Sequence, residues 1–284
     1  MPYEVKIILD SVSPDGARLT TLTAKYPRFI HAEMLTHRVF SRNTASSRAI
    51  PMAKLRQQVI DDPVIPIHWG KNQPGMQAAE ELDMIGRQWC EYVWFHSRAE
   101  AVFTHQRLEE LGLHKQVANR ILEPFLWTTC LISSTTWDNF LTLRRDKDAQ
   151  PEMQKIAGMI GDALDASKPV ERMLHIPFWT EEEDSRLSAL SSLHVNMGTL
   201  PTPFLDLLYR VSAARCARVS YLNHEGARDT TKDLELADRL ISSRHWSALE
   251  HPAKACPGQH GNFRGWKPYR KEFAGESGER VASC

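Results

Sequence analysis

The chain has 284 residues, 42% of them hydrophobic, and its 35 basic side chains are balanced by 35 acidic ones. This length can supply one large core. The zero net charge excludes the whole-molecule electrostatic field that attracts basic domains to nucleic acid or membranes. No apolar run approaches the roughly 20 residues of a membrane helix. The five cysteines form no CxxC pair and no signal peptide is visible, so we expect a reduced protein in the cytoplasm.

The amino-terminal region predicts a hairpin, a helix and a polar loop. Residues 3–25 hold two β-rich runs around the turn sequence SPDG. Residues 27–35 leave a strand and continue as an amphipathic helix. The next segment, residues 36–51, reads THRVFSRNTASSRAIP and contains hardly a residue suited to a core. A polar run at the end of a helix is typical of a binding loop on a rigid support, and we call residues 36–51 the arginine loop.

The middle of the chain predicts helices around one strand. Residues 61–77 are a Pro/Gly-rich connection without regular structure, long enough to be a candidate for function. Apolar residues at helical spacing between 77 and 122, with a break at Gly112, predict two helices. Residues 124–137 are rich in β-branched and aromatic side chains and predict a strand. A helical period begins again near Asp148.

The carboxyl-terminal part predicts two more helices. Residues 168–204 are rich in Pro, Ser and Glu and predict a surface connection. One helix starts near Leu205, and a charged helix ends near Ser242, before a tail rich in Trp, His and Gly. The sequence therefore predicts an α+β fold, with a mixed sheet flanked by long helices in a single domain, residues 1–284.

The arginine loop has the chemistry of a nucleotide site. Arg38 and Arg48, together with the hydroxyls of Ser46 and Ser47, can donate hydrogen bonds to a phosphate. Asn43 offers a paired donor and acceptor to the edge of a base or ring. The alternative is a solvated turn, which is the common state of polar loops of this composition.

The loop sequence HRVFSRNTASSR resembles R-H-R-x-x-S-x-N-x-x-S-x-R, the motif of the flavin-dependent thymidylate synthases. Six fixed positions match, namely His37, Arg38, Ser41, Asn43, Ser46 and Arg48. In that family the loop holds FAD and the phosphate of dUMP. The resemblance thus implies that His37, Arg38 and Asn43 bind the cofactor, and that Ser46, Ser47 and Arg48 bind the substrate.

Further segments resemble the family in the same order, over about residues 19–160. NRILEP resembles A-R-x-x-L-P, which implies that Arg120 binds phosphate. DNFLTLR resembles N-F-x-x-L-R, which implies that Asn139 contacts the flavin and that Arg144 grips and polarises the uracil as the catalytic residue. DAQPE resembles H-A-Q-x-E.

Two family segments stand at an unusual place in this chain. ARVSY and SALEH, at residues 217–221 and 247–251, resemble A-R-x-S-Y and S-P-F-E-H, which precede the arginine loop in the common layout. We hypothesise a circular permutant in which residues 205–284 correspond to the family's amino-terminal segment, because chain termini often lie close together at domain surfaces. The resemblance then implies that Ser220 touches the flavin phosphates or ribose and that His251 lies beside the flavin ring.

The resemblance implies reductive methylation of dUMP to dTMP, with methylenetetrahydrofolate and NADPH as co-substrates, in a homotetramer. It implies no metal, and His96 and His105 are too far apart on a helix to act as paired ligands. Four motif positions depart from the family: Thr36, Thr44, Ala49 and Asp148. They leave open a related enzyme that modifies C5 of another pyrimidine nucleotide or hydroxymethylates dUMP.

A third interpretation is a nucleic-acid-binding protein. The tail segment GNFRGWKPYRKEF interleaves basic and aromatic side chains, which can stack bases. Packing of this extended tail against its own domain is the structural alternative. The zero net charge argues against nucleic acid as a stable partner, because such domains usually carry a basic electrostatic footprint.

Overall fold

The computed structural model describes residues 3–179, 202–219 and 229–273. The strands are β1 (Glu4–Val12), β2 (Arg18–Pro27), β3 (Ser41–Thr44), β4 (Trp127–Ser134), β5 (Val170–Glu171), β6 (Leu174–His175), β7 (Ala253–His260) and β8 (Phe263–Pro268). The helices are α1 (His31–Leu35), α2 (Met52–Asp61), α3 (Met84–Glu110), α4 (Lys115–Ala118), α5 (Asp138–Arg145), α6 (Pro151–Ala166), α8 (Thr202–Arg218) and α9 (Thr230–Ser242). Short 3-10 turns are η1 (Arg28–Ile30), η2 (Asn119–Phe125), η4 (Trp246–Glu250) and η5 (Tyr269–Glu272).

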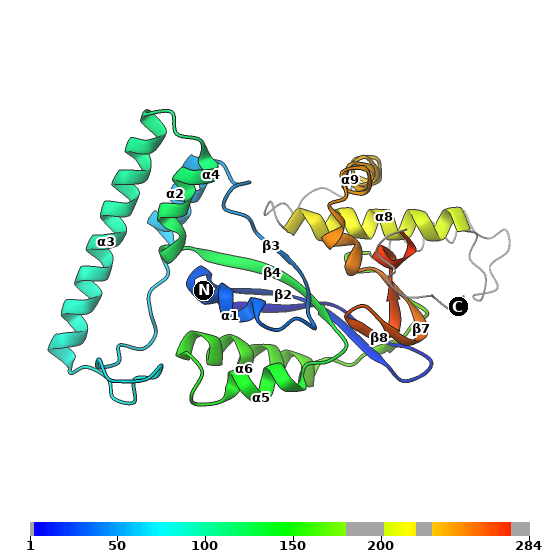
Figure 1. Ribbon diagram of the computed structural model, residues 1–284, viewed down its shortest axis with the longest axis horizontal. Coiled ribbons are helices and arrows are strands. Elements are labelled where there is room, and N and C mark those ends of the chain that lie inside the picture. The colour runs from blue at the N-terminus through cyan, green and yellow to red at the C-terminus, as the bar shows by residue number, and fades with distance from the viewer. Residues whose placement is uncertain (1–2, 180–201, 220–228, 274–284) are drawn as a thin grey trace.

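A five-stranded sheet with the order β3-β4-β2-β1-β5 forms the centre of the fold (Figure 1). The predicted hairpin is present as β1 and β2, and the predicted strand between helices is β4, antiparallel to β2. Strand β5 is parallel to β1, so the sheet is mixed. The second sheet has the order β6-β7-β8. The prediction of an α+β fold with a mixed sheet is confirmed.

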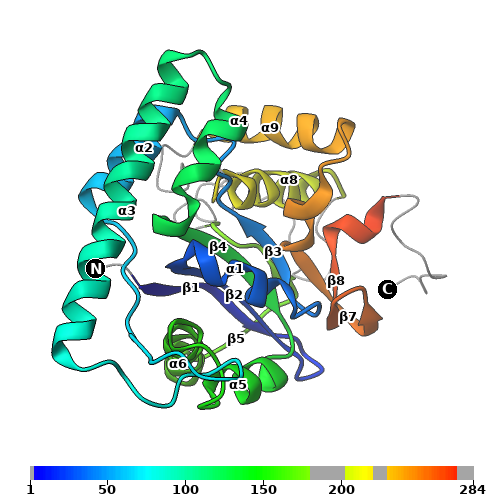
Figure 2. The same cartoon turned by 60° about the vertical axis from the view of Figure 1, so that its left-hand side comes forward.

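One face of the large sheet is covered by helices α5 and α6 through an apolar contact (Figure 2). Leu22 and Ile132 on the strands are completely buried, as are Ile156 and Ile160 on α6. Alternate strand residues point to opposite faces of a sheet. Leu22 and Ile132 therefore form one continuous apolar surface, since the register pairs them directly.

The opposite face is covered by the carboxyl-terminal part of the chain (Figures 1 and 2). Leu131 of β4 packs against Cys216 of α8 and Ala248 of η4. Leu19 of β2 packs against Trp266 of β8. The segments at the two ends of the sequence therefore share one core, which is what positions the candidate site.

Several predicted elements hold and others differ. Helices α8 and α9 lie where the two carboxyl-terminal helices were predicted, and the second of them ends at Ser242. Gly112 has a φ of +78°, a left-handed conformation that favours glycine, and it ends the long helix α3. The second predicted helix is reduced to the short elements α4 and η2. Helix α2 was not anticipated.

Pairing with distant strands explains the remaining differences. The arginine loop contains strand β3, the connection predicted at 168–204 contains β5 and β6 before the described residues stop at 179, and the tail forms the hairpin β7–β8. A partner strand outside the local window decides whether such short polar segments become strands. The expectation of reduced cysteines is wrong for Cys256, which is disulfide-bonded. Among the described helices, none combines the length and apolar character needed to cross a membrane.

Candidate functional site

Strand β3 places the centre of the arginine loop on the face of the sheet that the carboxyl-terminal segment covers. Ser41 pairs with Ser133 and Asn43 with Leu131, and directly paired residues of antiparallel strands point to the same side. Asn43 is 5% exposed, and its side chain makes no hydrogen bond to the described residues. The β7–β8 turn reaches the loop, where Asn262 Nδ2 donates to Ser41 Oγ at 3.3 Å.

His251 lies on the same face, directly after η4, which packs against β3. Its Nδ1 is hydrogen-bonded to Ser133 Oγ at 2.8 Å, and the ring is completely buried. Burial lowers the pKa of His251 to about 3, so the ring is neutral. Its Nε2 atom has no hydrogen-bond partner among the described residues. Asn43 and His251, two predicted cofactor residues far apart in sequence, are thus brought to one surface.

The start of the arginine loop is fixed by Arg144 from α5. Arg144 Nε donates to His37 Nε2 at 2.9 Å, and its Nη1 forms an ion pair with Glu33 Oε2 at 2.9 Å. Arg144 Nη2 donates to Thr36 Oγ1 at 3.0 Å. Burial lowers the pKa of His37, and the charges of Arg144 and Arg42 lower it further, so His37 is neutral and accepts this bond. The guanidinium of Arg144 is therefore held in one orientation.

The end of the arginine loop is held by Glu123 of η2. Ser47 Oγ donates to Glu123 Oε1 at 2.7 Å, and Arg120 Nη1 contacts the same oxygen at 2.6 Å. Ser46 is half-buried and Arg48 is exposed, each without a side-chain hydrogen bond to the described residues. The predicted phosphate-binding residues Ser46, Ser47, Arg48 and Arg120 thus form a second group. Strand β3 (Ser41–Thr44) lies between this group and the first group, which is Arg144 with Thr36 and His37.

Three other predicted residues are less constrained. Arg38 and Asn139 are exposed, and neither side chain forms a hydrogen bond or ion pair with the described part of the chain. Ser220 lies outside the described residues. The roles of all the predicted site residues stay predictions.

Sequence reasoning missed the acidic residues that orient the arginines. Glu33 lies on α1, four residues before His37. Glu123 lies three residues after Arg120, a spacing at which helical side chains are neighbours. Asn119 was also missed; it is fully buried and its Nδ2 donates to the carbonyls of Ser47 and Ile50. The spacing of Arg120 and Glu123 could have predicted their ion pair from the sequence. The contact between Glu33 and Arg144 could not be predicted in this way, because it depends on the tertiary fold.

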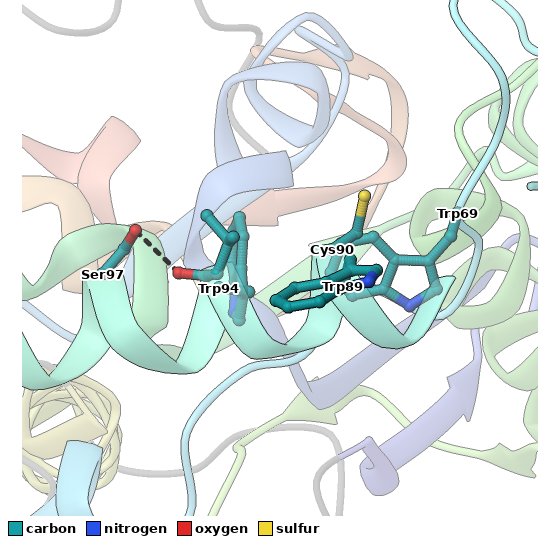
Figure 3. A pocket seen from close by; sticks show the side chains of 6 residues that line it. Trp69, Trp89, Cys90, Trp94 and Ser97 are labelled. Atoms are coloured by element: carbon teal, nitrogen blue, oxygen red, sulfur yellow. Dashed lines mark hydrogen bonds between the residues drawn. The ribbon is translucent and has the colours of Figure 1, made fainter. Parts of the chain in front are cut away.

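A separate apolar pocket of about 370 Å³ lies beside α3 (Figure 3). Its lining residues are Trp69, Trp89, Cys90, Val93, Trp94 and Ser97. None of these is a predicted site residue, and none carries a charge that would hold a phosphate. Within the described residues, no group of three or more His, Cys, Asp or Glu side chains is arranged to hold a metal ion.

Comparison with known proteins places the chain in a family. The model of the family described as Thymidylate synthase complementing protein matches residues 17–170, more than half of the chain, and the chain belongs to this family. A flavin-dependent thymidylate synthase from Thermosipho melanesiensis is 26% identical over 144 residues. That match covers 48% of this chain and 58% of the relative, so the chain spans less than two thirds of the relative's length. The resemblance read from the sequence is confirmed.

Solved structures give a weaker likeness. A UMP/dUMP methylase, PolB from Streptomyces cacaoi, was solved with 5-Br UMP and with 5-Br dUMP. These two structures align with TM-scores of 0.47 at 15% and 14% identity, over 57% of this chain and 88% and 89% of theirs.

Proposed function

We propose that this protein is a flavin-dependent enzyme that methylates C5 of dUMP to give dTMP. The observation that carries the proposal is that Asn43, in the loop with the family motif, and His251, from the carboxyl-terminal segment, lie on one face of the sheet. Membership of the family supports a nucleotide-modifying enzyme. FAD, methylenetetrahydrofolate, NADPH, the tetramer and the cytoplasmic location are parts of the proposal.

The residues present fit a flavin. The buried Nε2 of His251 lacks a partner among the described residues, and buried polar atoms are normally satisfied. Asn43, also nearly buried, has no side-chain partner in that part of the chain. His251 and Asn43 would contact the ring, Asn139 would contact its edge, and Arg38 would contact the pyrophosphate. When bound, FAD supplies the hydride, taken from NADPH, that reduces the transferred one-carbon unit.

The two groups at the ends of the arginine loop divide the nucleotide between them. Arg48 and Arg120, with Ser46 and Ser47, would neutralise the phosphate. Arg144 would donate to a uracil carbonyl and stabilise negative charge there as C5 becomes nucleophilic. Its bonds to Glu33, Thr36 and His37 fix its orientation before substrate binds, and preorganised donors of this kind are typically worth a few kcal/mol in the transition state.

Circular permutation remains part of the proposal. The match to the family model ends at residue 170. The segments ARVSY and SALEH, which resemble the motifs that precede the arginine loop in the common layout, lie after residue 216. The contacts of His251 with Ser133 and of Asn262 with Ser41 support the idea, because they join this carboxyl-terminal segment to the arginine loop.

The outer side of α3 supports the proposed oligomer. Ile85, Trp89, Tyr92 and Phe103 are between 61% and 65% exposed. Ile85, Trp89 and Tyr92 follow at the four- and three-residue spacing that is typical of a helix-packing seam, and Phe103 lies about three helical turns after Tyr92 on the same side. Light scattering should give four times the chain mass of 32.4 kDa, and Trp89→Lys should lower it, whereas Gln57→Lys, at an exposed position on α2, should not.

The reaction is tested by incubating the protein with FAD, NADPH, methylenetetrahydrofolate and dUMP, followed by mass spectrometry of the nucleotide. A methyl product supports the proposal. The second candidate, a related enzyme with another nucleotide or a hydroxymethyl product, is favoured by Thr36, which stands at a motif arginine and bonds Arg144. Parallel reactions with UMP and dCMP show whether another nucleotide is the substrate, and the mass of the product shows whether the added group is methyl or hydroxymethyl. Bound FAD without conversion of any nucleotide contradicts both.

A further inference from the structure

A chain of five buried polar side chains ends at the unpartnered atom of His251. Its members are Ser11, His175, Thr21, Ser133 and His251, each 0% exposed. Ser11 Oγ is bonded to His175 Nδ1 at 2.9 Å, and His175 Nε2 to Thr21 Oγ1 at 2.7 Å. Thr21 Oγ1 is bonded to Ser133 Oγ, and Ser133 Oγ to His251 Nδ1 at 2.8 Å. The chain crosses strands β1, β6, β2 and β4.

Both imidazoles in this chain are neutral. Burial lowers the pKa of His251 and of His175 to about 3, and for His175 the neighbouring Asp10 only partly opposes the shift. A neutral imidazole carries a single N–H, and a hydroxyl carries a single hydrogen. Each bond of the chain therefore contains one hydrogen, and a group that donates in one bond must accept in the other.

Two arrangements run in one direction along the whole chain. In the first, His251 and His175 both carry their hydrogen on Nδ1, and Nε2 of His251 presents a lone pair. In the second, both carry it on Nε2, and Nε2 of His251 presents a hydrogen. In a mixture, Thr21 or Ser133 accepts from both neighbours, and its two bonds fix the direction in which its own hydrogen points. Ser11 makes one bond in the chain, so its hydroxyl can rotate toward an acceptor, and mixtures are disfavoured by comparison. Each arrangement leaves one hydrogen outside the bonds of the chain. This hydrogen is on Ser11 in the first arrangement and on His251 in the second.

We propose that Ser11, His175, Thr21 and Ser133 are a hydrogen-bond relay that sets whether Nε2 of His251 accepts or donates. A ligand with an acceptor at Nε2 selects the second arrangement, and a ligand with a donor selects the first. The proposed flavin ring has ring nitrogens and carbonyls of both kinds, so this role of the relay rests on the proposed function. His175, Thr21 and Ser133 are positioning residues, and the relay itself is independent of any ligand.

The relay is tested by nitrogen NMR of sedimented protein that carries 15N-labelled histidine, with His251→Gln and His175→Gln used to assign the signals. In the ligand-free protein, both rings should carry hydrogen on the same nitrogen, Nδ1 or Nε2, or show equal fractions of the two forms. Opposite nitrogens on the two rings would overturn the relay. This arm needs no flavin and no turnover, and its two variants serve only to assign the signals.

Added FAD then tests transmission. We expect the signals of His251 and His175 to change together in the wild type and in Thr23→Val, a matched control on the same face of β2 whose hydroxyl has no hydrogen bond to described residues. In Thr21→Val, and in Ser133→Ala as a second variant, His251 should respond and His175 should not. His31, bonded to Tyr26 outside the relay, should stay unchanged throughout. A response of His251 alone in the wild type would overturn the relay, whereas failure of FAD to bind would count against the proposed function and leave the ligand-free result to decide.

Discussion

Both faces of the large sheet are covered by other elements, but the two faces differ in chemistry. The face under α5 and α6 is apolar, with Leu22 and Ile132 against Ile156. The face under the carboxyl-terminal segment mixes apolar contacts with Thr21, Ser133 and buried histidines. Burying polar groups is costly unless each is hydrogen-bonded, so the second face gives up stability that the first retains. Such an arrangement is expected where a fold holds a functional site.

The largest expected effect lies in the layer that covers the polar face. Asp233 of α9 is 1% exposed and binds Arg215 and Arg218 of α8 at 2.9 and 2.6 Å. Asp233→Ala leaves buried positive charge and should lower the free energy of unfolding by about 3–5 kcal/mol. Urea unfolding measures this. The control Asp238→Ala removes the 64% exposed partner of Arg210 and should cost less than about 1 kcal/mol. Equal losses in both variants would contradict the assignment.

Adjacent residues of β4 compare the two faces directly. Ile132→Ala on the apolar face opens a cavity and should cost about 2–5 kcal/mol. Ser133→Ala on the polar face removes the partner of Thr21 and His251, and should cost about 1–3 kcal/mol. Thermal unfolding of both variants shows which one loses more stability. A larger loss for Ser133→Ala than for Ile132→Ala would contradict the view that the apolar face contributes more to stability.

Arg144 connects the apolar side to the proposed chemistry. Arg144→Ala should reduce turnover of dUMP by more than tenfold, a loss of at least about 1.4 kcal/mol in transition-state stabilisation. Steady-state kinetics should show the loss in kcat while the melting curve confirms a folded protein. The neighbouring Arg145→Ala, which loses bonds to Asp162 and Gly158, is the control and should stay near wild-type turnover. Near-normal turnover of Arg144→Ala would refute its role.

A further expected effect, absent near neutral pH, is a pH dependence from the buried histidines. Burial lowers the pKa of His175 and His251 to about 3, and of His31 to about 4, where Arg28 and Arg42 add to the shift. The unfolded chain binds protons below about pH 6.5 and the folded rings do not, so stability is complete above that pH and falls as pH decreases. For each ring, the free energy of unfolding should fall by about 1.4 kcal/mol per pH unit as the pH decreases from about 6.5 to about 4.

Urea unfolding at several pH values between about 7.5 and 5 measures this slope. His251→Gln should reduce the slope by one histidine's share, because glutamine does not titrate. Stability that is flat over this range would contradict the buried, neutral state of the rings.

The sequence predicted the parts of the molecule that local chemistry determines. The hairpin β1–β2, strand β4 and helix α9 follow from periodicity and turn residues, and the motif identified the arginine loop. It did not predict β3 or the β7–β8 hairpin, because their partners are distant in sequence. The relay was also invisible, since Thr21 and His175 meet only through strand pairing, and no spacing in the sequence relates them.

The central claim is that the arginine loop and the carboxyl-terminal segment form one flavin and nucleotide site. The most direct measurement is the visible absorbance of the purified protein after addition of FAD, followed by titration with dUMP. We predict oxidised-flavin bands that shift when dUMP binds, and weaker FAD binding in His251→Gln than in the control Thr23→Val. A colourless protein that takes up no FAD would contradict the account, and the arginine loop would then need a different ligand.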